Sequence, residues 1–195
     1  FCLPAVLLQE AKLRSAAMPF DWTFCSVQSL IWILQSEFTY FFDPTTLTSR
    51  TEVLGHPSAT NGHYDSDRLD RPFFNHKDPT TEADRVYYQR CIERFLGLRG
   101  KKASLFVFDE FGEIDSLYRP LIETLDRHMP GLKLYGIRHH LADNQPFEIR
   151  HRVGGGGHNL YDLNASKVMD GNSFKRSEDA ELLIQHLREH ANREI

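Results

Sequence analysis

Cysteine is scarce in this chain of 195 residues, which contains only Cys2, Cys25 and Cys91. An odd and widely spaced set does not build the disulfide framework of a small secreted protein. No Cys-x-x-Cys pair is present, so the commonest arrangement of zinc ligands is also missing. We therefore expect free thiols in a reducing cytoplasm, with no cofactor and no bound metal.

The sequence also lacks a basic surplus and any long apolar run. The net charge is -4 and the isoelectric point is about 6.2, which does not favour nucleic acid or an anionic membrane as a partner. No apolar stretch approaches the roughly 20 residues that span a bilayer, and no signal peptide is visible. With 41% hydrophobic and 26% charged residues, the composition is that of an ordinary globular protein.

Hydrophobic spacing predicts alternating helices and strands. Helical periodicity appears over 3–14, 26–42, 81–97 and 114–129, and again from Ser177 onward. Apolar or alternating runs predict strands over 72–76, 105–108, 132–137 and 147–153. The segment 44–72 is expected to be a long loop that can include short strands, and 159–174 is expected to be irregular. We expect the apolar face of the second helix to pack with the strands over 105–108 and 132–137.

This order predicts an α/β fold, with a layered sheet flanked by helices. Because 195 residues suit one core, we expect a single domain over residues 1–195.

Cys2 stands where a reactive thiol would be placed. Pro4 has its backbone angle preset for a first helical turn, which puts Cys2 at the N-cap or the first helical position. Unpaired N–H groups and the positive end of the helix dipole favour a thiolate there, and the thiolate is the nucleophilic form. The competing interpretation is a small buried residue at the start of a helix.

A cysteine nucleophile needs a base, and His76 is the best candidate on local grounds. It ends the short apolar run 72–76. Asp21 lies between two large apolar residues, so burial would require a partner for its carboxylate. That partner is either the imidazole of His76, which Asp21 would then orient, or the N–H groups of its own loop or of the next helix. Asp78 is a second candidate for orienting the imidazole.

Asp78 and two further side chains are candidates for contact with a substrate. Trp22 offers a flat apolar surface for a glycan or a protein. Asp109 follows a predicted buried strand, where open α/β sheets bind ligands, although a solvated acidic turn explains it equally well.

Histidines and glycines suggest other sites that the spacing does not support. Ten histidines are present, and His186 and His190 share a helix face, but Leu187 stands where the His-Glu-x-x-His metalloprotease pattern has its glutamate. The run Gly154 to Gly157 is not followed by a helix start, so it predicts a flexible hairpin and not a phosphate loop.

The motifs together resemble a bacterial family of papain-like cysteine peptidases, an uncharacterised group often met beside polysaccharide-assembly genes. The resemblance covers most of residues 1–140, and its most specific part is Pro-Phe-Asp-Trp with the upstream cysteine. The matching elements are Cys2-Leu3-Pro4-Ala5, Leu13-Arg14, Pro19-Phe20-Asp21-Trp22, Phe74-Asn75-His76, Arg94-Phe95 and the run Leu105 to Phe108.

The resemblance implies that Cys2 is the nucleophile and His76 its partner. It also implies an alternative fold, a divergent papain-like α+β arrangement. Family members carry a short strand before the cysteine, which implies that this chain lacks that strand. The expected function is a cysteine-dependent hydrolase or acyl-transfer enzyme acting on a peptide, acyl or glycan-linked substrate, with the polar segment 44–72 covering the site. The alternative is a non-catalytic glycan- or protein-binding accessory domain in polysaccharide assembly. The sequence leaves the oligomeric state open.

Overall fold

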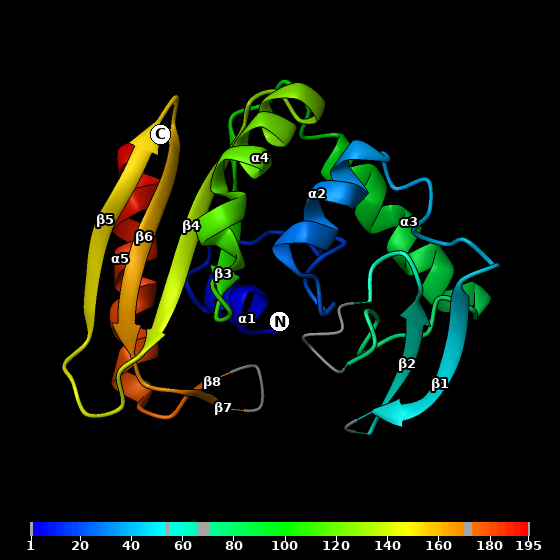
Figure 1. The fold of residues 1–195 in the computed structure, drawn as a ribbon, viewed down its shortest axis with the longest axis horizontal. Coiled ribbons are helices and arrows are strands. Elements are labelled where there is room, and N and C mark those ends of the chain that lie inside the picture. The colour runs from blue at the N-terminus through cyan, green and yellow to red at the C-terminus, as the bar shows by residue number, and fades with distance from the viewer. Residues whose placement is uncertain (1, 54, 66–70, 170–172, 195) are drawn as a thin grey trace. The chain divides into compact units, whose positions relative to one another are not determined.

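The computed structural model describes residues 2–53, 55–65, 71–169 and 173–194, which form five helices and eight strands (Figure 1). The helices are α1 (Leu3–Glu10), α2 (Val27–Gln35), α3 (Glu82–Leu96), α4 (Glu113–His128) and α5 (Ser177–Glu194). The strands are β1 (Leu47–Val53), β2 (His56–Asn61), β3 (Ala103–Asp109), β4 (Leu132–Leu141), β5 (Glu148–Gly155), β6 (His158–Ala165), β7 (Val168–Met169) and β8 (Ser173–Phe174). The mixed α/β class predicted from the sequence is confirmed.

The chain divides into two compact units, and each is assembled from separate stretches of sequence. The first unit comprises Phe1–Ala17, Leu105–Gly112 and Leu134–Ile195. The second comprises Met18–Ser104 and Glu113–Lys133.

The first unit is built on a four-stranded sheet in the order β3-β4-β6-β5 (Figure 1). Strand β6 pairs parallel with β4 and antiparallel with β5, so the sheet is mixed. Gly156 and Gly157 join β5 to β6 with φ angles of 60° and 85°, which a tight hairpin turn requires at both central positions. The predicted glycine hairpin is therefore confirmed.

Helices α1 and α5 cover one face of this sheet. Alternate residues of β4 and β6, such as Ile137 and Leu163, point to that face and are fully buried. Leu3 and Leu7 of α1 and Leu183 of α5 pack in the same cluster. The apolar sides of both amphipathic helices thus pack on one apolar face of the sheet.

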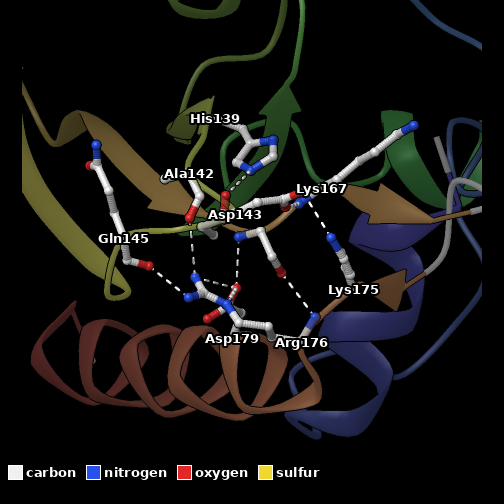
Figure 2. Close-up of polar contacts among 10 residues, drawn as sticks. His139, Ala142, Asp143, Gln145, Lys167, Lys175, Arg176 and Asp179 are labelled. Atoms are coloured by element: carbon white, nitrogen blue, oxygen red, sulfur yellow. Dashed lines mark hydrogen bonds and ion pairs between the residues drawn. The ribbon is translucent and has the colours of Figure 1, made fainter.

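A polar cluster fixes the start of α5 to the loops of the first unit (Figure 2). The Asp179 carboxylate, only 1% exposed, accepts the Ser166 N–H at 2.7 Å and the Arg176 guanidinium at 3.0 Å. Arg176 also donates to the carbonyl of Gln145 at 2.6 Å. A buried carboxylate is costly without such partners, so this cluster holds the β4–β5 and β6–β7 connections against the helix.

In the second unit, α2 packs along α4. Ser26 caps α2 by accepting the Ser29 N–H at 3.0 Å, and the carboxylate of Glu113 accepts the Val27 N–H at 2.8 Å. Glu113 therefore satisfies a free N–H at the positive end of α2 from the first turn of α4.

An aromatic core fills the rest of the second unit. The ring of Phe41 lies within 5.7 Å of the rings of Phe73, Phe74 and Tyr88, centre to centre. The backbone of Phe74 forms bridges to Thr23 on one side and to Ala59 of β2 on the other. Residues far apart in sequence are therefore joined at Phe74.

Two predicted elements end or begin differently from the prediction. The second helix stops at Gln35 because Glu37 and Phe38 have positive φ angles, which a right-handed helix does not accommodate. The polar segment 44–72 contains the antiparallel hairpin β1–β2, with residue 54 and residues 66–70 outside the described part.

One other prediction is wrong, and one stays untested. The stretch 159–174 is not irregular throughout, because it contains most of β6, which lies between β4 and β5 in the sheet. The buried residues Leu160 and Leu163 of β6 are three positions apart, so they do not show the alternation by which a strand is recognised in a sequence. Helix α2 belongs to the second unit, whereas the strands from Leu105 and Leu134 onward belong to the first, so the expected packing between them stays a prediction.

Among the described residues, no helix is both long enough and apolar enough to cross a membrane.

Adjacent leucines of α5 provide a matched test of the first unit's core. Leu183 is fully buried, whereas its neighbour Leu182 is 43% exposed. We expect Leu183→Ala to lower the free energy of unfolding by about 2–5 kcal/mol, because it leaves a cavity in the cluster, and Leu182→Ala by less than about 0.5 kcal/mol. Urea unfolding followed by circular dichroism measures both, and equal losses would show that α5 does not present this face to the sheet.

Candidate active site

Cys2 is the N-cap residue of α1. Its carbonyl accepts the Val6 N–H at 3.1 Å, the first hydrogen bond of the helix, and its side chain is 7% exposed. Pro4 lies in the first turn, where its missing N–H costs no hydrogen bond. Cys2 thus lies at the end of α1 where the backbone N–H groups have no partner within the helix.

The other two cysteines are poor nucleophiles. Burial raises the pKa of the Cys25 thiol to about 12, with a further contribution from the nearby carboxylate of Glu113. Burial also raises the pKa of Cys91, which has no exposed surface, although Tyr87 and Arg94 oppose that shift. Both remain protonated at neutral pH, and a thiol reacts far more slowly than a thiolate.

His76 lies in an aromatic and imidazole cluster of the second unit. Its ring centre is 5.3 Å from that of Trp22, edge to face, and 4.4 Å from that of His56. Burial and the neighbouring His56 hold the pKa of His76 below its usual range. A histidine with a lowered pKa is unprotonated at neutral pH and can accept a proton.

Asp21 and Asp78, the two candidates for orienting the imidazole, both bind other groups. One carboxylate oxygen of Asp21 accepts the Met18 N–H at 2.6 Å, so Asp21 closes its own loop. Asp78 accepts hydrogen bonds from the Ser49 hydroxyl and from the backbone N–H and hydroxyl of Thr80, at 2.9 and 2.6 Å. These contacts match the structural interpretation offered for Asp21, and they give Asp78 the role of joining β1 to the start of α3.

Asp109 ends β3 in the first unit. Its carboxylate accepts the N–H groups of Phe111 and Gly112 at 2.9 and 3.1 Å, which makes a turn stabilised by the aspartate side chain. Gly112 has a φ of 81°, and a Cβ atom there would lie 2.9 Å from the guanidinium of Arg138. Asp109 is therefore held by the turn that it forms.

Three other histidines in the first unit are bound in structural roles. His158 is buried and accepts the Leu134 N–H on Nδ1 at 3.0 Å. His139 is buried, with Nε2 3.2 Å from the Ala165 carbonyl and Nδ1 3.7 Å from Glu110. His140 pairs with Asp162 at 2.9 Å. At least one ring nitrogen of each histidine is engaged by the sheet or its loops.

Within residues 2–53, 55–65, 71–169 and 173–194, no group of three histidine, cysteine, aspartate or glutamate side chains is arranged to hold a metal ion.

The comparisons with known proteins gave one match. A family model described as "Putative papain-like cysteine peptidase (DUF1796)" matches residues 1–131. The chain belongs to this family. Neither a curated protein nor a solved structure matches the chain.

The match to this papain-like cysteine peptidase family includes every candidate site residue predicted from the sequence. It ends before His139, His140 and His158, so the matched segment contains His76 and not these three histidines. The candidate site residues, all within the matched span, are Cys2, Asp21, Trp22, His76, Asp78 and Asp109.

The structure groups these candidates by unit. Trp22 and His76 are in direct ring contact in the second unit, which also contains Asp21 and Asp78. Cys2 and Asp109 belong to the first unit. Sequence reasoning missed His56, which lies in the long polar segment 44–72 and has no distinguishing pattern around it.

The hydrogen bonds to Asp78 predict a pH-dependent contribution to stability. Burial raises the pKa of its carboxyl, but the hydrogen bonds from Ser49 and Thr80 outweigh burial and leave the pKa below its ordinary value. The ionised carboxylate therefore stabilises the fold above about pH 4, and that stabilisation is lost as the pH falls through the lower folded-state pKa.

We expect Asp78→Asn to cost about 1–3 kcal/mol of unfolding free energy at pH 7, because an amide cannot accept all three hydrogen bonds. The loss between pH 5 and pH 3 should be smaller in this variant than in the wild-type chain. Urea unfolding across this pH range measures both effects. Asp126→Asn, at an exposed carboxylate paired with Lys133, is the control and should change stability by less than about 1 kcal/mol. An equally steep acid loss in Asp78→Asn would contradict the assignment.

Proposed function

We propose that the protein is a cysteine-dependent hydrolase or acyl-transfer enzyme in which Cys2 is the nucleophile. The observation that carries the proposal is the position of Cys2 at the N-cap of α1, inside the segment matched by a papain-like cysteine peptidase family. The raised pKa values of Cys25 and Cys91 support the choice, because they leave Cys2 as the thiol suited to attack.

His76 serves as the base in this proposal. Support comes from its lowered pKa, from its shielding by Trp22, and from its place in the Phe-x-His element of the matched segment. The assignment of His76 to Cys2 rests on the sequence motif. Asp21, a neighbour of Trp22 in sequence, stabilises the loop that carries this shield through its bond to Met18.

The proposed reaction has two steps. The Cys2 thiol gives its proton to His76 as sulfur attacks the carbonyl carbon of a peptide, acyl or glycan-linked substrate, and N–H groups at the start of α1 stabilise the oxyanion. His76 then returns the proton to the leaving group. Water, or an acceptor in acyl transfer, attacks the resulting thioester and releases Cys2. The free thiols suit a reducing compartment such as the cytoplasm.

Selective alkylation tests the nucleophile. We expect iodoacetamide at pH 7 to modify Cys2 at least about tenfold faster than Cys25 or Cys91 in the folded chain, since their thiolate fractions are small. Peptide mapping by mass spectrometry after timed quenching measures the three rates. Equal rates would contradict the proposal and leave a non-catalytic binding domain as the better interpretation.

Acyl transfer tests the base. With p-nitrophenyl acetate as a generic acyl donor, we expect acetyl-Cys2 to accumulate in a burst of p-nitrophenol. His76→Gln should slow this step by about 10²–10⁴-fold. His63→Gln is the matched control, because His63 lies in the same unit and pairs with Asp43 at 3.0 Å. A His76→Gln rate equal to that of the control would exclude His76 as the base.

A further inference from the structure

The position of His76 follows from the backbone pairing around Phe74. The N–H and carbonyl of Phe74 exchange hydrogen bonds with Ala59 at 3.0 and 2.9 Å, and the Phe24 N–H donates to the Phe73 carbonyl at 2.8 Å. The short segment 73–74 is therefore held between residues 23–24 on one side and β2 on the other. His76 follows two residues after Phe74, where a neighbouring stretch of chain lies on each side of the segment.

Each of these neighbouring chains places a ring against His76. Continued antiparallel pairing would set Pro57 opposite His76, but proline has no N–H to donate, so the ladder stops. The preceding residue, His56, then packs its ring 4.4 Å from that of His76, while the ring of Trp22, from the chain on the other side of Phe74, lies at 5.3 Å.

We propose that His56 is a positioning residue for His76, which it holds in place and keeps unprotonated for the thiol chemistry. This inference rests on the proposed function, because it gives His76 a reason to be kept neutral. His56 itself is exposed at the start of β2 and has no part in the proton transfer.

Charge repulsion between the two imidazoles provides the physical basis. A proton on one ring disfavours a proton on the other at this separation, and partial burial of His76 makes its own charged form less favourable. Both effects lower the pKa of His76, burial being the larger. Trp22 carries no titratable group.

The charged residues beside His76 in sequence are directed elsewhere. The Lys77 amine binds the Asp84 carboxylate at 3.0 Å and lies 4.4 Å from the centre of the Tyr87 ring. The Asp78 carboxylate binds Ser49 and Thr80. His56 is therefore the titratable side chain that these contacts place directly against the His76 ring.

Histidine titration by NMR tests this inference in the full chain. Ring resonances of His76 are followed from pH 4 to pH 8 in the wild type, in His56→Gln and in His56→Phe. We expect the midpoint of His76 to rise by about 0.5–1 pH unit in both variants, because each removes the neighbouring charge. His56→Phe retains an aromatic ring, so it separates charge from packing. His63→Gln is the matched control and should leave the midpoint unchanged.

The pH dependence of Cys2 alkylation then connects the pair to the reaction. The rate of Cys2 alkylation by iodoacetamide should change with pH as His76 is protonated. In His56→Gln, the pH of this change should shift by the same amount as the NMR midpoint of His76. An unchanged His76 midpoint in both His56 variants, or a shifted midpoint with an unshifted alkylation profile, would overturn the role of His56. Failure of the proposed function is a separate result, because it appears as an alkylation profile that His76→Gln does not alter.

Discussion

The backbone pairing of Phe74 is the constraint on which the second unit depends. One short segment satisfies its hydrogen bonds with the chain before α2 and with β2, while its side chain enters the aromatic core beside Phe41 and Tyr88. Because buried backbone groups must be paired, three distant stretches of sequence are fixed by a few bonds. The rings of Trp22, His56 and His76 gather at one place as a result.

The first unit depends on a different kind of constraint, the burial of one sheet face under two helices. Helix α1 carries Cys2 at its start and packs through Leu3 and Leu7 on the cluster that also receives α5. A residue at the start of such a helix has its backbone fixed by the core and needs no loop to hold it. The polar cluster around Arg176 and Asp179 adds a fixed start for α5.

The sequence predicts elements whose signal is local, and it fails where the deciding contact is distant. The Ser177 start of α5, the glycine hairpin and the helix start at Cys2 depend on neighbouring residues, and the structure contains each of them. Strand β6 was missed because its burial comes from β4 and β5, not from a period of its own. In the candidate site, the Cys2, Trp22 and His76 motifs are visible in the sequence. The ring contact between His56 and His76 is not, because it follows from a pairing between Ala59 and Phe74.

The discontinuous make-up of the two units has a consequence for synthesis on the ribosome. Chains fold from the N-terminus as they emerge, and every residue of the second unit has been made by Lys133. Helix α1 and the strand from Leu105 must then wait for β4, β6 and α5 before their apolar faces are covered. The thiol of Cys2 leaves the ribosome before any residue of the second unit, and the helix that carries it is packed only after the second unit has been made.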